Sequence, residues 1–146
     1  MSLSREIETS REKQVITDGL VPAGTTIGGE VGTFYVDFTL WSGDGTRSLD
    51  LNGLVDTGAS YTMVPAPLLD DLGVAREESL MFRLADGSTR EYDTGLVVID
   101  LEGRSKSVYV VFGPENRILL GAMALEAFAL AADAKNHRLV PADLTL

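Results

Sequence analysis

The stretch GLVDTGAS, residues 53–60, passes within a few positions from an apolar run to a loop of small residues. The alternating pattern of SLDLNGLVD, residues 48–56, predicts a β-strand that ends at Asp56. Gly58 lets the loop turn tightly, which leaves backbone amide groups to point at the carboxylate oxygens. The sequence therefore predicts a carboxylate in a partly desolvated pocket at the end of a strand. A catalytic aspartate fits this setting, and so does an aspartate that only caps the turn.

The segments on either side of this stretch predict a mostly-β single domain with two short helices. A long hairpin is expected at 80–100, with Asp86-Gly87 at its tip. Helices are expected at 65–73, where prolines start the segment and a glycine stops it, and at the Ala- and Leu-rich segment 121–133. The alternating or β-branched segments expected to form the other strands are 33–41, 48–56, 107–112, 117–120 and 137–141.

Residues 1–31 differ in composition from the rest of the chain. A polar start is followed by LVPAGTTIGGE, residues 20–30, which is rich in Gly, Thr and Pro. Such segments are typical of mobile termini and linkers. We therefore predict an N-terminal extension over 1–31 and a folded domain over 32–146.

The composition excludes several classes of function. Twelve basic and twenty-two acidic residues give a net charge of −10, which repels nucleic acids and anionic lipid surfaces. The chain has no cysteine and a single histidine, which excludes disulfides, a cysteine nucleophile and most His-based metal sites. No apolar run is long enough to cross a membrane, and the charged start does not resemble a signal peptide. We expect a soluble, cytoplasmic protein that binds neither nucleic acid nor membrane.

A second Asp-Thr-Gly occurs at 93–95, within the expected hairpin 80–100. Unlike Asp56, Asp93 follows a polar segment and precedes a strand-like one. Gly95 inside a strand suggests a bulge or a bend. We interpret Asp93 as a solvent-facing strand residue, because too little chain separates the two copies for each to have its own lobe.

The order of these features resembles the retropepsin-like aspartic proteases, the single-lobe relatives of pepsin. The resemblance rests on LVDTGAS, residues 54–60, on ILLGA, residues 118–122, and on the helix that follows, and it extends from about Thr33 to Pro141. It implies a closed, β-barrel-like acid-protease fold with a flap hairpin and two short helices. The helix at 65–73 is more typical of the bacterial and cellular members than of the viral ones. The first thirty residues have no counterpart in the family.

The resemblance also implies roles for individual residues. Asp56 would be the catalytic carboxylate, Thr57 would hydrogen-bond to the loop of a partner subunit, and Gly58 would allow close approach of the backbone. Leu119, Leu120 and Gly121 would pack behind the catalytic loop. The turn LADGS, residues 84–88, would be the flap. The residues expected to contact substrate are Leu84, Ala85, Asp86, Gly87, Val64 and Ile118.

Aspartic protease chemistry needs two carboxylates that share one proton, and it needs no metal or cofactor. A chain with one such aspartate therefore implies a homodimer that hydrolyses peptides between two copies of Asp56. Ala59 replaces the hydroxyl donor of pepsin-like lobes, which implies a working pH that is mildly acidic to near neutral. Two alternatives stay open: a retropepsin-fold module that dimerises or binds peptides without cutting them, and an unrelated small β-barrel that binds a small molecule.

Overall fold

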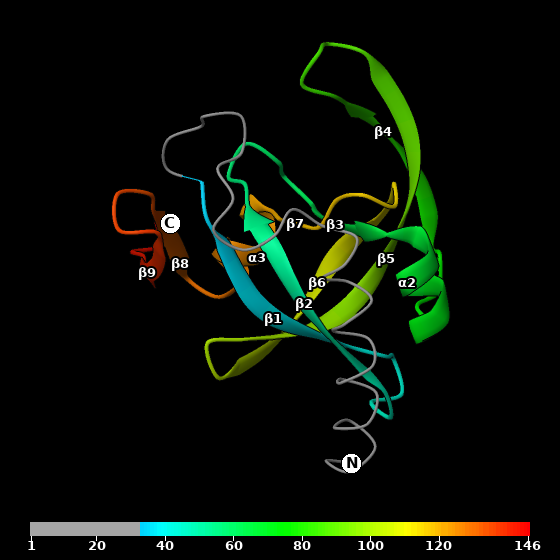
Figure 1. The fold of residues 1–146 in the computed structure, drawn as a ribbon, viewed down its shortest axis with the longest axis horizontal. Helices are drawn as coiled ribbons and strands as arrows, with labels where there is room; N and C mark the ends of the chain where they lie inside the picture. The colour runs from blue at the N-terminus through cyan, green and yellow to red at the C-terminus, as the bar shows by residue number, and fades with distance from the viewer. Residues whose placement is uncertain (1–32) are drawn as a thin grey trace.

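The computed structural model describes residues 33–146, and Figure 1 shows their arrangement. The predicted extension over 1–31 lies outside the described residues. Nine strands and two helices follow one another along the described part of the chain. The strands are β1 (Tyr35–Trp41), β2 (Ser48–Val55), β3 (Thr62–Pro65), β4 (Glu78–Arg83), β5 (Thr89–Leu101), β6 (Arg104–Gly113), β7 (Leu119–Leu120), β8 (Leu130–Asp133) and β9 (Arg138–Pro141). The helices are α2 (Ala66–Leu72) and α3 (Ala122–Ala127).

Seven strands form one ring-like sheet, in the order β1-β2-β7-β3-β6-β5-β4. The ring closes because β1 pairs with β5 as well as with β2. Most neighbours are antiparallel, but β2 runs parallel to β7 and β3 runs parallel to β6. The mostly-β fold with two short helices is thus confirmed.

The core fills the inside of this ring. Alternate residues of the strands point inward, as in β2, where Leu49, Leu51 and Val55 are buried. The largest fully buried side chain is Phe128, which follows α3. Burying a side chain of this size stabilises the fold by roughly 1.5–3 kcal/mol relative to leaving it exposed.

The predicted long hairpin is present as β4 and β5. Its arm extends beyond the ring, because β6 pairs with β5 only from Thr94 onward and β4 pairs only with β5. The tip is a tight turn in which Gly87 adopts a positive φ of 88°. In Figure 1 the arm rises from the body of the sheet next to α2.

The C-terminal region differs from the prediction of one helix over 121–133. Helix α3 ends at Ala127, Ala129 adopts a positive φ of 53°, and the chain then forms β8. Strand β8 pairs with β9 in a separate two-stranded sheet, which Figure 1 shows on the opposite side of the molecule from α2. In the described residues no helix is both long and apolar enough to cross a membrane.

Candidate active site

Asp56 lies immediately after β2, where this strand ends beside β7. The two strands are paired in parallel, with Leu54 opposite Leu119 and Val55 opposite Leu120. The backbone N–H of Asp56 continues this ladder by donating to the carbonyl of Leu120 at 3.1 Å. The position of Asp56 is therefore fixed by a buried strand pair, and its side chain is half-buried.

The loop after Asp56 folds back on the carboxylate. The N–H of Gly58 donates to Asp56 Oδ1 at 3.0 Å, and the N–H of Ala59 donates to the Asp56 carbonyl at 3.1 Å. A Cβ on Gly58 would lie 3.2 Å from Asp56 Oδ1. A side chain at this position would therefore crowd the carboxylate that the bond orients.

The start of α3 holds the loop from behind. The N–H groups of Ala122 and Met123 donate to the carbonyls of Ala59 and Ser60, at 2.8 and 3.0 Å. The N–H of Gly121 donates to Thr62 Oγ1 at 3.1 Å, and this hydroxyl is buried. These bonds connect the loop that follows Asp56 to the β7–α3 junction, and we call them the loop clamp.

Gly121 is required at the centre of the loop clamp. A Cβ at this position would lie 2.5 Å from both the carbonyl carbon and the carbonyl oxygen of Tyr61, and 2.9 Å from the carbonyl oxygen of Ala59. Real side chains do not approach backbone atoms so closely. Leu119, Leu120 and Gly121 thus lie behind the loop.

An open cleft of about 560 Å³ borders the carboxylate. One wall comes from Asp56, Thr57 and the residues before β1, and the other comes from α3 and β8. Thr57 is exposed. The residues that line the cleft are Thr33, Phe34, Val55, Asp56, Thr57, Ala122, Leu125, Glu126, Leu130, Ala131, Ala132 and Ala134.

The predicted flap residues lie at the tip of the β4–β5 arm. Ala85, Asp86 and Gly87 are exposed and Leu84 is half-buried. The hydroxyl and the N–H of Ser88 donate to Asp86 Oδ1 at 2.6 and 2.9 Å, and the hydroxyl bond, ahead of the N–H bond, lowers the pKa of Asp86 from its ordinary value. The tip is thus an ordered turn.

The two other predicted substrate contacts, Val64 and Ile118, lie in the core. Val64 is fully buried in β3, and Ile118 is 3% exposed just before β7. Neither side chain lines the cleft. Apolar character suggested a pocket wall, but here it reflects packing behind the site.

Asp93, in the second Asp-Thr-Gly, does not join Asp56. It lies within β5, opposite Ser79 of β4, where it accepts a hydrogen bond from the Ser79 hydroxyl and pairs with Arg76 at 2.9 Å. The Ser79 hydroxyl, followed by Arg76, holds the pKa of Asp93 below its ordinary value. A carboxylate so engaged fits a role in bracing the arm.

Of the bulge or bend expected at Gly95, the structure excludes the bulge. The β5–β6 register runs unbroken through it, with Gly95 opposite Val110. A Cβ there would lie 2.4 Å from the carbonyl oxygen of Ala75, so the glycine permits the chain after α2 to approach the sheet closely.

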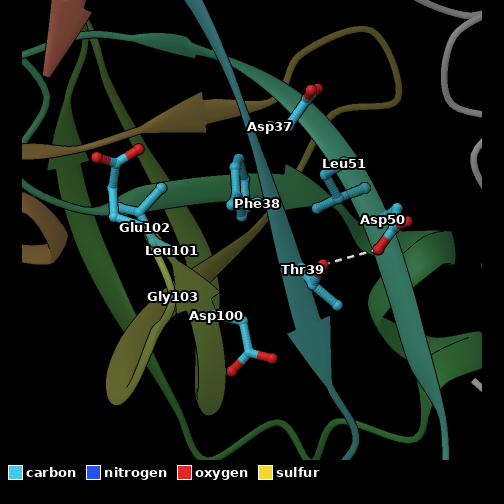
Figure 2. A pocket seen from close by; sticks show the side chains of 9 residues that line it. All are labelled: Asp37, Phe38, Thr39, Asp50, Leu51, Asp100, Leu101, Glu102 and Gly103. Atoms are coloured by element: carbon cyan, nitrogen blue, oxygen red, sulfur yellow. Dashed lines mark hydrogen bonds between the residues drawn. The ribbon is translucent and has the colours of Figure 1, made fainter. Parts of the chain in front are cut away.

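Figure 2 shows a second, smaller hollow of about 180 Å³, which shares no lining residue with the cleft. It is acidic, but its aspartates have partners within the fold. Asp50 accepts from Thr39 at 2.7 Å, Asp37 accepts from Asn52 at 2.9 Å, and Asp100 accepts from the Trp41 ring N–H at 2.8 Å. Over residues 33–146, no group of three His, Asp or Glu side chains is arranged to hold a metal ion. The hollow is lined by Asp37, Phe38, Thr39, Asp50, Leu51, Asp100, Leu101, Glu102 and Gly103.

Sequence reasoning missed Thr62, which completes the loop clamp, and with it the short strand β3. The stretch Thr62–Pro65 is only four residues long and runs into α2. Its alternation of buried and half-buried side chains was too short to recognise as a strand. A threonine among apolar residues directly after the loop is the signal that was available.

Comparison with known proteins assigns the family. The model of the family described as "gag-polyprotein putative aspartyl protease" matches residues 48–127, which is more than half of the chain and includes Asp56 and the loop clamp. No curated protein matches significantly.

Among solved structures, the chain is similar to the protease of simian foamy virus (mac), with 22% identity and a TM-score of 0.47 over 63% of this chain and 91% of that chain. It is also similar to the EIAV protease in complex with the inhibitor HBY-793, with 20% identity and a TM-score of 0.49 over 77% of this chain and 91% of that chain. These structural similarities do not assign a family. The family model does, because it matches more than half of the chain. The chain belongs to the gag-polyprotein aspartyl protease family.

Proposed function

We propose that this protein is a homodimeric aspartic endopeptidase whose active site combines Asp56 of two copies. One observation carries the proposal. Of the two Asp-Thr-Gly carboxylates, Asp56 borders an open cleft, whereas Asp93 is held by Ser79 and Arg76 within a strand pair. One chain therefore offers half of a catalytic pair, and a two-fold axis through the site would supply the other half.

The chemistry follows from two carboxylates placed about 3 Å apart, which share one proton because two adjacent like charges are unfavourable. The ionised carboxylate removes a proton from a water molecule as the water oxygen attacks the peptide carbonyl carbon. The protonated carboxylate donates a hydrogen bond to the carbonyl oxygen. The carboxylate that took the water proton passes it to the nitrogen of the resulting tetrahedral intermediate, the C–N bond breaks, and the products are a carboxylic acid and an amine.

The loop geometry suits this role. The Gly58 N–H orients one carboxylate oxygen, and the loop clamp fixes the backbone that carries Asp56. Such preorganisation matters because a displacement of about 1 Å can lower the rate roughly a hundredfold. Thr57 is exposed at the cleft, and we propose that its hydroxyl hydrogen-bonds to the corresponding loop of the partner.

In this proposal the substrate is an extended peptide held between the two catalytic loops and the tips of the two arms. Main-chain groups of a strand-like peptide can pair with the tip of the arm, where Ala85 and Asp86 are exposed. Val64 and Ile118 are left out of the pocket because both are buried in the core. The net charge of −10 per chain disfavours strongly anionic peptides.

The branch of the family is also a proposal. Helix α2 lies between the catalytic loop and the arm, as in the bacterial and cellular single-lobe members that the sequence resembles. Viral members build much of their dimer from the two chain ends. A crystal structure of the dimer with that arrangement would contradict placing this chain in the bacterial or cellular branch.

The test compares wild type, Asp56→Asn and Asp93→Asn on a complex peptide mixture between pH 4 and pH 7, with cleavage read by mass spectrometry. We expect cleavage by wild type and Asp93→Asn and none by Asp56→Asn. Circular dichroism must first show that all three proteins are folded at the assay temperature.

Two results would overturn the proposal. Activity retained in Asp56→Asn would show that a different group performs the reaction. A folded, dimeric wild type that cleaves no peptide would instead support a non-catalytic module that uses the same fold to dimerise or to bind peptides.

A further inference from the structure

Four aromatic rings connect the arm of the hairpin to the catalytic loop. Tyr61, at the end of that loop, meets Phe82 of β4 edge-to-face, with 5.2 Å between ring centroids. Phe82 also meets Tyr92 of β5 at 6.1 Å, and Tyr61 meets Tyr109 of β6 at 6.5 Å. Segments far apart in sequence are therefore joined by ring contacts on one side of the sheet.

The arm has little other support. Its part beyond the ring-like sheet consists of β4 and the first residues of β5, which pair only with each other. Isolated two-stranded hairpins are marginally stable in water. At the base of the arm, Asp93 pairs with Arg76. Nearer the tip, Phe82 reaches the catalytic loop through Tyr61.

Tyr61 is a fixed anchor for this contact. Its carbonyl lies against Gly121 so closely that no side chain fits between them, and the next residue, Thr62, is bonded to the Gly121 N–H. On β4, Phe82 is half-buried, whereas the adjacent Met81 points to the other face and is 65% exposed. Only one face of β4 thus engages the loop.

We propose that the Tyr61–Phe82 contact holds the arm in place over the catalytic loop, so that both are positioning residues for the proposed peptidase. The inference rests on the proposed function and extends it by assigning how the flap is held. An edge-to-face pair of this kind shifts an equilibrium between held and released arms by roughly two- to tenfold. The contact between Tyr61 and Phe82 needs only the two aromatic rings and not the tyrosine hydroxyl.

The first test measures release of the arm without using catalysis. The full chain carries Asp56→Asn, so that it cannot cut itself, and is treated briefly with trypsin. Arg83 and Arg90 are exposed and lie on either side of the tip of the arm. Mass spectrometry follows cleavage at each of them. When opening and closing are fast, the cleavage rate reports the released population.

We expect Tyr61→Leu and Phe82→Leu each to raise cleavage at Arg83 and Arg90 by roughly two- to tenfold. The double variant is expected to exceed the larger single effect only slightly, because both remove the same contact. Tyr61→Phe and Phe82→Tyr keep both rings and should behave like the parent. Met81→Leu is the matched control, since it alters the same strand on its other face.

The second test measures kinetics of the same substitutions with Asp56 intact. Substrate binds only the held arm, so KM scales with the reciprocal of the held fraction. KM should therefore rise in both leucine variants, by at most the roughly tenfold shift of the equilibrium, while kcat stays nearly constant. Tyr61→Phe should restore KM. A purely structural role would reduce the fraction of active enzyme and therefore kcat, with KM unchanged.

The inference is overturned if Tyr61→Leu leaves cleavage at Arg83 and Arg90 unchanged, or if the two single effects are additive. Failure of the proposed function has a different signature. In that case wild type cleaves no peptide, while the trypsin pattern of the Tyr61 and Phe82 variants still shows the ring contact.

Discussion

At the scale of the residue, the two copies of Asp-Thr-Gly show how context decides chemistry. Thr57 and Gly58 lie in an exposed loop after a strand end, where Gly58 donates to the carboxylate before it. Thr94 is buried in the middle of β5, and its hydroxyl donates to the carbonyl of Glu78 at 3.0 Å. The same tripeptide thus lies in an exposed loop beside a cleft in one place and inside a strand pair in the other.

Asp93 should make the stability of the folded chain depend on pH. Its pKa is lowered by Ser79 and Arg76 in the folded chain. Its stabilising contribution is therefore present above the unfolded pKa of about 3.9 and is lost as the pH falls through the lower folded value. We expect wild type to melt at a higher temperature than Asp93→Asn at pH 6, and the difference to shrink below pH 4. A difference that stays constant from pH 6 to pH 3 would contradict this assignment.

Gly121→Ala should be among the most damaging small substitutions. The added methyl group would meet the backbone of Tyr61 at 2.5 Å, and backbone in the loop clamp cannot move aside without shifting the loop that carries Asp56. We expect a loss of about 2–3 kcal/mol in the free energy of unfolding, measured with urea, together with loss of peptidase activity. Gly43→Ala is the control, because a Cβ there meets nothing within 4 Å and should change neither quantity.

At the scale of the element, the sequence predicted the parts that carry strong local signals. The hairpin 80–100 has a turn dipeptide between two alternating runs, and α2 has proline at its start and glycine at its end. The segment 121–133 misled because Ala and Leu favour a helix, yet the left-handed Ala129 ends α3 and the pairing with β9 makes β8 a strand. Tertiary pairing overrode local preference there.

Burial could not be read from the sequence in the same way. Val64 and Ile118 are apolar residues near the site, and their inward direction is set by the register of β3 and of the chain entering β7. A shift of one position exchanges the two faces of a strand. The position of Asp56 at the end of a strand was predictable, because the turn that follows it has a sequence signature of small residues.

Thr62→Val should separate the stability contributed by the Gly121–Thr62 hydrogen bond from that contributed by side-chain packing. Valine has nearly the same shape but cannot accept the bond from the Gly121 N–H, which would remain buried without that partner. The free energy of unfolding is expected to fall by about 1–3 kcal/mol. Thr62→Ser keeps the hydroxyl and loses one methyl group, so it should lose about 1 kcal/mol or less. Equal losses for the two variants would mean that the hydrogen bond contributes little.

At the scale of the whole molecule, the ring-like sheet brings together segments that are distant in the chain. Strand β7 and the loop clamp meet at the C-terminal end of β2, and the arm reaches the loop that follows β2 through the Tyr61–Phe82 contact. The cleft beside Thr57 opens on this end, between the loop after Asp56 and α3–β8. The family motif predicted which carboxylate would lie there, but the clefts and ring contacts depend on long-range pairing that no local pattern encodes.

A shared site predicts how mixed enzymes behave. If each active site needs Asp56 from both copies, subunit exchange between equal amounts of wild type and Asp56→Asn leaves about a quarter of the dimers with two intact carboxylates. The mixture should therefore show about a quarter of the activity of the same total amount of wild type, at concentrations where dimers persist. Independent single-chain sites would leave about half. As a control, a mixture of wild type with Asp93→Asn should keep nearly full activity, because Asp93 lies outside the proposed pair. If the mixture of wild type with Asp56→Asn keeps half of the activity after confirmed subunit exchange, the shared pair is excluded.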